Sequence, residues 1–202
     1  MAKIDLNQAD SMYFDVLKEI GNIGAGNATT AMAHMLNCKV DMSVPQVRLL
    51  EFRDVGSLIG GEEQIMAGVY LMVEGEVSGS MMFLLEKESA RGLVAKLMGT
   101  APENDELSEM ERSALMEIGN IITASYLNSL SSLTNLAIHP SVPALCIDMA
   151  GAILSVPAIE FGTMGDRILL IETRFSEGLN GYFILVPDLE SYDKILSSLG
   201  IE

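Results

Sequence analysis

The sequence predicts an α+β protein that is internally duplicated, with two related halves arranged around a pseudo-twofold axis. A polar motif occurs twice, and its matched positions are always 98 residues apart, as Glu19 is from Glu117. Each copy lies in a long segment with helical periodicity. Runs of alternating apolar and polar residues come after each segment, as in strands of an antiparallel sheet. A period of this length is too long for a solenoid repeat, so the copies indicate two halves of one domain.

The repeated motif reads [D/S]-x3-E-x2-N-x22-P. Its copies are Asp15, Glu19, Asn22 and Pro45, and Ser113, Glu117, Asn120 and Pro143. A single Glu-x-x-Asn arises by chance about once in a chain of this size, or less. Two copies with the same flanking residue types at the same distances are not accidental. We therefore expect a single domain over residues 1–202, made of repeats at about 1–103 and 104–202.

The first half begins with a predicted helix over residues 11–37, for which Asp10 or Ser11 is the expected N-cap. The remaining expected elements of this half are extended chain broken by proline over 38–50, a short helix near 52–60, strands over 66–74 and 76–85, and a helix near 87–98. The last helix is expected to end at Gly99. The turn-rich, acidic stretch from 99 to 105 predicts the junction between the halves.

The second half repeats this order. Its long helix, over residues 108–134, starts at Ser108-Glu109-Met110-Glu111, which has the spacing of a capping box, and Leu107 just before it is a candidate hydrophobic staple. The remaining expected elements are extended chain over 136–147, a short helix near 147–155, strands over 167–174 and 180–186, and a helix near 188–199 that ends at Gly200.

The first three motif positions share one face of each long helix. At about 100° per residue, positions i, i+4 and i+7 fall within a stripe roughly 60° wide. Small residues extend the two stripes, namely Gly26, Thr29 and Ala33, and Ala124 and Ser131. The expected core side of the first helix holds Val16, Ile20, Ile23, Gly24, Asn27 and Ala31. The glutamate and the asparagine would then project from a low surface that another protein can approach closely.

An exposed Glu or Asn on a helix is usually an ordinary solvated residue. Glycine inside a helix costs about 1 kcal/mol relative to alanine, and asparagine is also a mediocre helix former. Retention of Gly-Asn in two otherwise diverged copies therefore indicates a function. A phosphate-binding loop at Gly21–Gly26 is disfavoured, because a helix rather than a strand precedes it and the second copy lacks two of its glycines. Close helix packing explains Gly24 better.

The composition argues against several classes of partner and binding site. The net charge of −16 argues against a nucleic-acid or anionic-membrane partner, since both require clustered Lys and Arg. We expect neither a signal segment nor membrane insertion. Cys38, Cys146, His34 and His139 lack metal-ligand spacing, so no metal site is expected and the histidines are interpreted as structural. These features predict a cytoplasmic protein without disulfides, in which the 49% apolar residues form a sizeable core.

The doubled motif resembles that of the CheC/CheX/FliY family of bacterial chemotaxis phosphatases, and two complete copies resemble its CheC-type members. The resemblance implies an enzyme that hydrolyses the aspartyl phosphate of the chemotaxis response regulator CheY. It implies a fold in which two motif helices lie side by side over a β-sheet with their active faces outward. It further implies a partner, the receptor deamidase CheD. The alternative is a non-catalytic interaction module like the middle domain of the flagellar switch protein FliM, which the two Glu/Asn pairs disfavour.

The residue types fit acyl-phosphate hydrolysis, which needs a water in line with the scissile bond and little covalent help. Asn22 and Asn120 are expected to hold that water, since an amide oxygen accepts its hydrogen bond. Glu19 and Glu117 would pair with a lysine of the regulator. Asp15 and Ser113 are expected to be auxiliary contacts, and Pro45 and Pro143 to form rigid turns or to be purely structural. No cofactor of its own is expected, and Mg²⁺ would come with the regulator.

A short amphipathic segment from Asp148 to Leu154 is a candidate docking site for the deamidase, and residues 54–59 are its counterpart in the first half. The alternative role of Asp148 is a solvated helix cap. The 14 methionines could indicate an adaptable binding surface, but Met81 and Met82 lie in a predicted strand and are expected in the core.

Overall fold

The computed structural model describes residues 11–41, 43, 46–161, 167–174 and 180–200. Its elements come in the order α1 (Ser11–Leu36), β1 (Gln46–Glu51), α2 (Phe52–Leu58), β2 (Ile65–Gly75), β3 (Gly79–Glu86), α3 (Lys87–Met98), α4 (Glu109–Thr134), β4 (Ile138–Pro140), β5 (Ala144–Met149), α5 (Ala150–Phe161), β6 (Arg167–Arg174), β7 (Asn180–Pro187) and α6 (Leu189–Ser198). The predicted α+β class is confirmed. The halves share one order of elements apart from β4; their duplication stays a prediction.

The strands form one sheet with the order β1-β6-β7-β3-β2-β4, in which β5 also pairs with β2. Every described pairing is antiparallel, as the sequence predicted. The halves meet in the middle of the sheet, where Phe83 of β3 lies opposite Phe183 of β7. Strand β1 also pairs with β6 of the other half. Neither half therefore has a sheet to itself.

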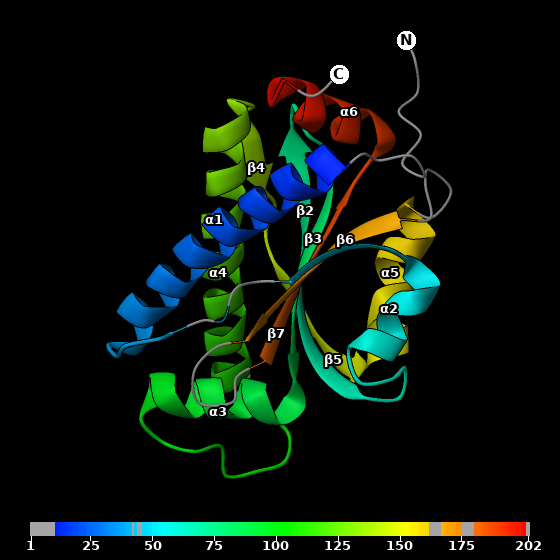
Figure 1. Ribbon diagram of the computed structural model, residues 1–202. Coiled ribbons are helices and arrows are strands. Elements are labelled where there is room, and N and C mark those ends of the chain that lie inside the picture. Colours follow the sequence, from blue (N-terminus) through cyan, green and yellow to red (C-terminus); the bar gives the residue numbers. More distant parts are fainter. Residues whose placement is uncertain (1–10, 42, 44–45, 162–166, 175–179, 201–202) are drawn as a thin grey trace.

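Helices cover both faces of this sheet (Figure 1). Because neighbouring side chains of a strand point to opposite faces, successive residues of β3 enter different clusters. Phe83 belongs to the core cluster beneath α1 and α4, whereas Leu84 belongs to the cluster beneath α2 and α5. Met81 and Met82 divide in the same way and are both buried, as expected. The molecule thus has three layers, with α1 and α4 together on one outer side.

Helices α1 and α4 cross in close contact (Figure 1). A Cβ added at Gly24 would overlap the ring of Tyr126, which is fully buried. That ring stacks on Phe183 with 5.7 Å between ring centroids. Close by, Asn27 Nδ2 donates a hydrogen bond of 2.8 Å to Ser129 Oγ. The predicted packing role of Gly24 and the side-by-side arrangement of the two helices are confirmed.

The start of α4 is capped as the sequence predicted. Ser108 Oγ accepts a hydrogen bond from the Glu111 backbone N–H, and Glu111 Oε2 accepts one of 2.7 Å from the Ser108 backbone N–H. Leu107 is half-buried against the core beneath this helix. The expected helix stops at Gly99 and Gly200 both have positive φ, at 72° and 76°. Asp10, one of the two expected N-caps of α1, lies outside the described residues.

Two expectations about side-chain position are wrong. Helical period places Thr29 on the outward stripe of α1, but Thr29 is only 7% exposed and its Oγ1 donates to the Ala25 carbonyl at 2.7 Å. On the expected core side, Ile23 and Ala31 are only half-buried, and Asn27 is exposed. A helical wheel assumes a single covering surface. Here α1 is covered both by the sheet and by α4 at an angle, so its buried side is rotated from the predicted one.

The short helix expected near 147–155 begins later and runs longer, over Ala150–Phe161, with Pro157 inside it. Asp148 is therefore not a helix cap. It lies in β5 opposite Met66 of β2, and its Oδ1 accepts a 2.7 Å hydrogen bond from the backbone N–H of Met149. Pairing with β2 keeps these residues extended where the local amphipathic pattern favoured helix.

Candidate active faces on the two long helices

The Glu/Asn pairs of both motif copies lie on the outer sides of α1 and α4. Glu19 and Glu117 are exposed, and Asn22 and Asn120 are half-buried. Among the described residues, none of these four side chains makes a hydrogen bond or an ion pair. Their carboxylate and amide groups are therefore free to contact a partner molecule.

The residues that lie in sequence between the motif glutamate and asparagine are buried toward the sheet. Ile20 and Ile118 are 3% and 1% exposed, and both belong to the core beneath the helices. Gly119 is also buried, and a Cβ there would overlap the side chain of Val69 on β2. The repeated Ile-Gly is thus explained by packing against the sheet. Packing leaves the glutamate and the asparagine unexplained.

The two pairs lie on separate parts of this face. The helices cross at Gly24 and Tyr126, C-terminal to the motif on each helix. Figure 1 shows the N-terminal parts of α1 and α4 leaving the crossing in different directions. The two Glu/Asn pairs are consequently displaced from each other along the surface rather than gathered into one cleft.

The remaining motif positions are less informative. Ser113 is exposed in the first turns of α4, one turn before Glu117. Pro143 is half-buried in the link between β4 and β5. Asp15 lies in α1, but its side chain is outside the described part of the structure, as is all of Pro45. The structure therefore places the Glu/Asn pairs and leaves two auxiliary positions undescribed.

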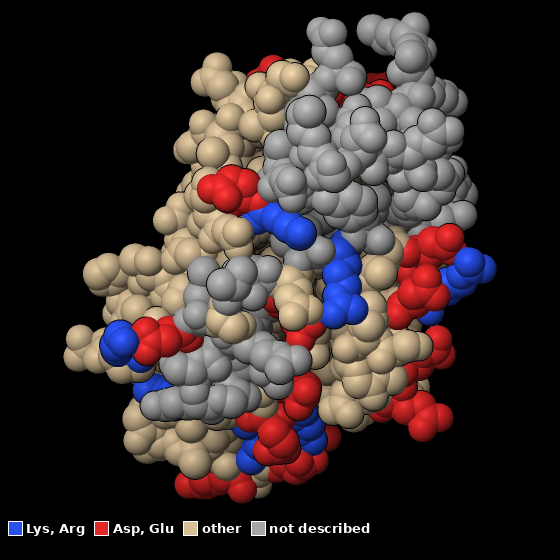
Figure 2. All heavy atoms as spheres, viewed as in Figure 1, with Lys and Arg blue, Asp and Glu red and all other residues tan. Residues whose placement is uncertain are grey.

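The surface around the crossing carries little charge. In the space-filling view, the described surface over the C-terminal half of α1 and the upper part of α4 is mostly uncharged, whereas charged side chains of both signs gather over α3 and the loop below it (Figure 2). In the described ranges, no three His, Cys, Asp or Glu side chains come together as metal ligands. No described helix is long and apolar enough to cross a membrane.

A second surface lies on the opposite layer. Asp148 is exposed at the end of β5, close in sequence to the exposed apolar side chains of Met149, Val156 and Ile159. The exposed fractions of these three are 45%, 48% and 79%. The amphipathic pattern of the sequence marks only the part of this surface between Asp148 and Leu154, because the rest of α5 is mainly apolar and is typical of a buried helix.

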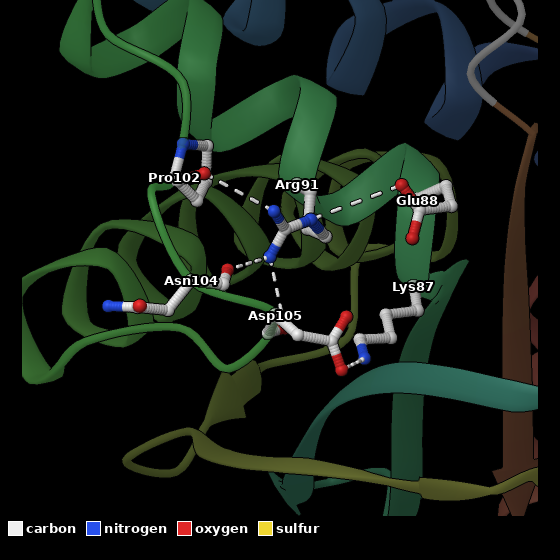
Figure 3. Close-up of polar contacts among 6 residues, drawn as sticks. All are labelled: Lys87, Glu88, Arg91, Pro102, Asn104 and Asp105. Atoms are coloured by element: carbon white, nitrogen blue, oxygen red, sulfur yellow. Dashed lines mark hydrogen bonds and ion pairs between the residues drawn. The ribbon is translucent and has the colours of Figure 1, made fainter.

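Sequence reasoning missed an ionic cluster at the junction between the halves (Figure 3). Arg91 of α3 donates to the backbone carbonyls of Pro102, Asn104 and Asp105, so one guanidinium binds three residues of the loop between α3 and α4. Lys87 Nζ lies 2.7 Å from Asp105 Oδ2 and lowers the pKa of that carboxyl group. The sequence pattern that could have predicted this cluster is the pair Lys87 and Arg91 on one helix, followed by the acidic, turn-rich segment 99–105.

Comparison with known proteins agrees with this geometry. A family model described as the CheC-like family matches residues 12–48 and 110–147, the stretches that contain the two motif copies. The CheY-P phosphatase CheC of Bacillus subtilis is 37% identical over 195 residues, which cover 92% of this chain and 93% of the relative.

Solved structures show the same fold. The FliY structure of Thermotoga maritima superposes with a TM-score of 0.73 at 23% identity, covering 96% of this chain and 98% of that one. The middle domain of FliM from H. pylori superposes with a TM-score of 0.68 at 13% identity, covering 94% and 99%. At these identities the likeness concerns the fold alone.

Proposed function

The chain belongs to the CheC-like family, and on this basis we propose that it is a phosphatase that hydrolyses the aspartyl phosphate of phosphorylated CheY. The observation that carries the proposal is the pair of outward Glu/Asn sets, which have no partners among the described residues and no explanation in packing. The name of the Bacillus subtilis relative supports the same substrate. A response regulator as substrate would place the protein in the cytoplasm.

In this proposal Asn22 and Asn120 each hold a water in line with the phosphorus–oxygen bond of the regulator. The amide oxygen accepts a hydrogen bond from the water, and the amide N–H group remains available to the regulator. The water oxygen attacks phosphorus, the bond to the aspartyl oxygen breaks, and inorganic phosphate and a free aspartate carboxylate result. Because the transition state is loose, positioning supplies most of what this chain needs to contribute.

Glu19 and Glu117 lie one turn before the asparagines and would fix the regulator by pairing with a lysine. Asp15 and Ser113 would add auxiliary contacts at the same surfaces. This chain would supply no metal ligand, and Mg²⁺ bound to the regulator would neutralise charge on the phosphoryl group. Each motif face would then be a complete site, and the chain would form one domain with two such sites.

The test is the decay of phosphorylated CheY in the presence of wild type, Asn22→Ala, Asn120→Ala and the double variant. We expect each single variant to keep part of the acceleration and the double variant to lose it all. Asn128→Ala is the matched control, because Asn128 is an exposed asparagine on α4 outside the motif. A double variant that accelerates decay as wild type does would refute the asparagine role.

The fold shared with the FliM middle domain favours one alternative, a non-catalytic interaction module. The same experiment separates the two functions. A wild-type chain that binds phosphorylated CheY without changing the rate of its decay would support the module and contradict the phosphatase.

We also propose that the receptor deamidase CheD docks on the surface formed by Asp148, Met149, Val156 and Ile159. These residues provide an exposed carboxylate at the end of β5 and exposed apolar side chains on β5 and α5, in the layer opposite the motif helices. Asp148→Lys should weaken CheD binding at least about tenfold, whereas the same change at Asp193, an exposed residue of α6, should not. Equal binding by both variants in a calorimetric titration would remove CheD from this surface.

A further inference from the structure

A cavity of about 410 Å³ opens between α3, the loop after it, the start of α4 and the edge of the sheet. Its apolar lining includes Ile65 of β2, Ile147 of β5 and Leu107. The volume lies within the range of small-molecule sites, which runs from about 300 to 1,000 Å³. The cavity is on neither motif face, so a ligand bound there would be independent of the proposed phosphatase activity.

The charged lining is unusual for this chain. Lys87, Arg91 and Arg112 face Asp105 and Glu106 there, so cations exceed anions by one in a protein whose net charge is −16. Two of the cations are fixed. Lys87 is held by Asp105, and Arg91 by the backbone carbonyls of the loop (Figure 3). Both side chains are mostly buried, with 27% and 19% exposed.

Arg112 is different. It is exposed in the first turn of α4, and among the described residues its guanidinium makes no ion pair and no hydrogen bond. Arg112 therefore gives the cavity lining a guanidinium that no described group occupies, and a guanidinium fork can bind a carboxylate through two hydrogen bonds. The cavity already holds one carboxylate, that of Asp105, on its lysine.

We propose that this cavity binds a carboxylate monoanion carried on an apolar body, with the carboxylate on Arg112 and the apolar part against Ile65, Leu107 and Ile147. Lys87 is paired with Asp105, and Arg91 with Glu88 and the loop carbonyls, so Arg112 is the one lining cation without a partner among the described residues, which matches a monoanion. A phosphate dianion would face Asp105 and Glu106 with fewer free cations than it needs, so its binding is disfavoured. The ligand would touch both halves of the chain at their junction.

The test is calorimetric titration of the full chain at low ionic strength with octanoate, octan-1-ol and inorganic phosphate as probes. We expect octanoate to bind wild type with a Kd of about 1 mM or lower and Arg112→Gln at least about tenfold more weakly. Arg53→Gln is the matched control, because Arg53 is an arginine with a 78% exposed side chain on α2, away from the cavity. It should bind octanoate as wild type does.

A second variant tests the apolar lining independently of the arginine. Ile147→Thr keeps a β-branched residue in β5 and should also weaken octanoate binding. The proposal is overturned by absence of octanoate binding to wild type, or by equal binding to Arg112→Gln. Octan-1-ol binding as tightly as octanoate would refute the carboxylate contact, and phosphate binding as tightly would refute the need for an apolar body. Circular dichroism of each variant confirms that it is folded.

Discussion

Asn22 and Asn120 occupy positions that the fold itself does not demand. Their preceding glycines lie on the buried side, and at Gly119 no side chain would fit beside Val69. The asparagines instead face outward without partners among the described residues. An alanine at either position would favour the helix by its intrinsic propensity. Packing therefore explains the glycine, whereas the neighbouring asparagine fits the proposed contact with another molecule.

Gly24→Ala should destabilise the protein although alanine is the better helix former. The new Cβ would overlap Tyr126, whose fully buried ring is stacked on Phe183 and has little room to move. Overpacking of a core costs about 1–3 kcal/mol, which exceeds the gain of up to about 1 kcal/mol from removing glycine. The measurement is the free energy of unfolding in urea.

Gly92→Ala on α3 is the control for this substitution. Apart from the neighbouring residues and the backbone of its own helix, no described atom lies within 4 Å of a Cβ added there, so only the gain in helix propensity remains. We expect Gly92→Ala to raise the free energy of unfolding by roughly 0.5–1 kcal/mol. If both variants gained stability alike, the contact between Gly24 and Tyr126 would not limit the approach of α1 to α4.

At the scale of elements, the sequence predicted best where the determinants are local. The capping box at Ser108 and the glycine stops after α3 and α6 depend on a few neighbouring residues, and all are present. The outward Glu/Asn stripes come from helical period alone. Thr29 and Asp148 were misplaced because their environments come from α4 and β2, which are distant in sequence. The order of strands, in which the halves interleave, also has no local signal.

Ser108→Ala should remove the cap of α4 and lower the free energy of unfolding by about 1 kcal/mol. Ser132→Ala is the control, since Ser132 is an exposed serine on the same helix, away from its start, whose hydroxyl donates to the Asn128 carbonyl and to no other described residue. Urea unfolding at neutral pH measures both. Equal stability of the two variants would show that the cap contributes nothing.

The same cap predicts a pH dependence. Hydrogen bonds from the Ser108 backbone N–H and hydroxyl hold the pKa of Glu111 below its ordinary value of 4.5. A carboxyl group whose pKa is lowered by folding stabilises the native state above its unfolded pKa. That contribution is lost as the pH falls from about 4.5 through the lowered value. The stability difference between wild type and Ser108→Ala should therefore shrink in acid.

At the scale of the whole molecule, the three-layer fold separates the proposed functions in space. Both motif helices lie on one side of the sheet, and the surface around Asp148 belongs to the other side with α2 and α5 (Figure 1). The cavity at Arg112 lies at the junction of the halves, near the loop held by Arg91. Partners at the first two surfaces could therefore bind together without competing for the same residues.

The net charge of −16 and the two exposed glutamates predict how salt should act on the proposed reaction. If Glu19 and Glu117 bind a lysine of phosphorylated CheY, their contacts are exposed ion pairs. Salt weakens such pairs and screens the longer-range attraction that brings the two proteins together, with a Debye length of about 10 Å at 0.1 M. Rising ionic strength should then raise KM and leave kcat nearly unchanged, because the water-positioning amides are neutral.

Glu19→Gln with Glu117→Gln should raise KM at low salt and flatten its salt dependence. Glu63→Gln with Glu103→Gln, which removes the same charge from exposed sites outside the motif, should keep the wild-type slope. Equal slopes in both double variants would mean that the field of the whole molecule, rather than the motif glutamates, attracts the regulator.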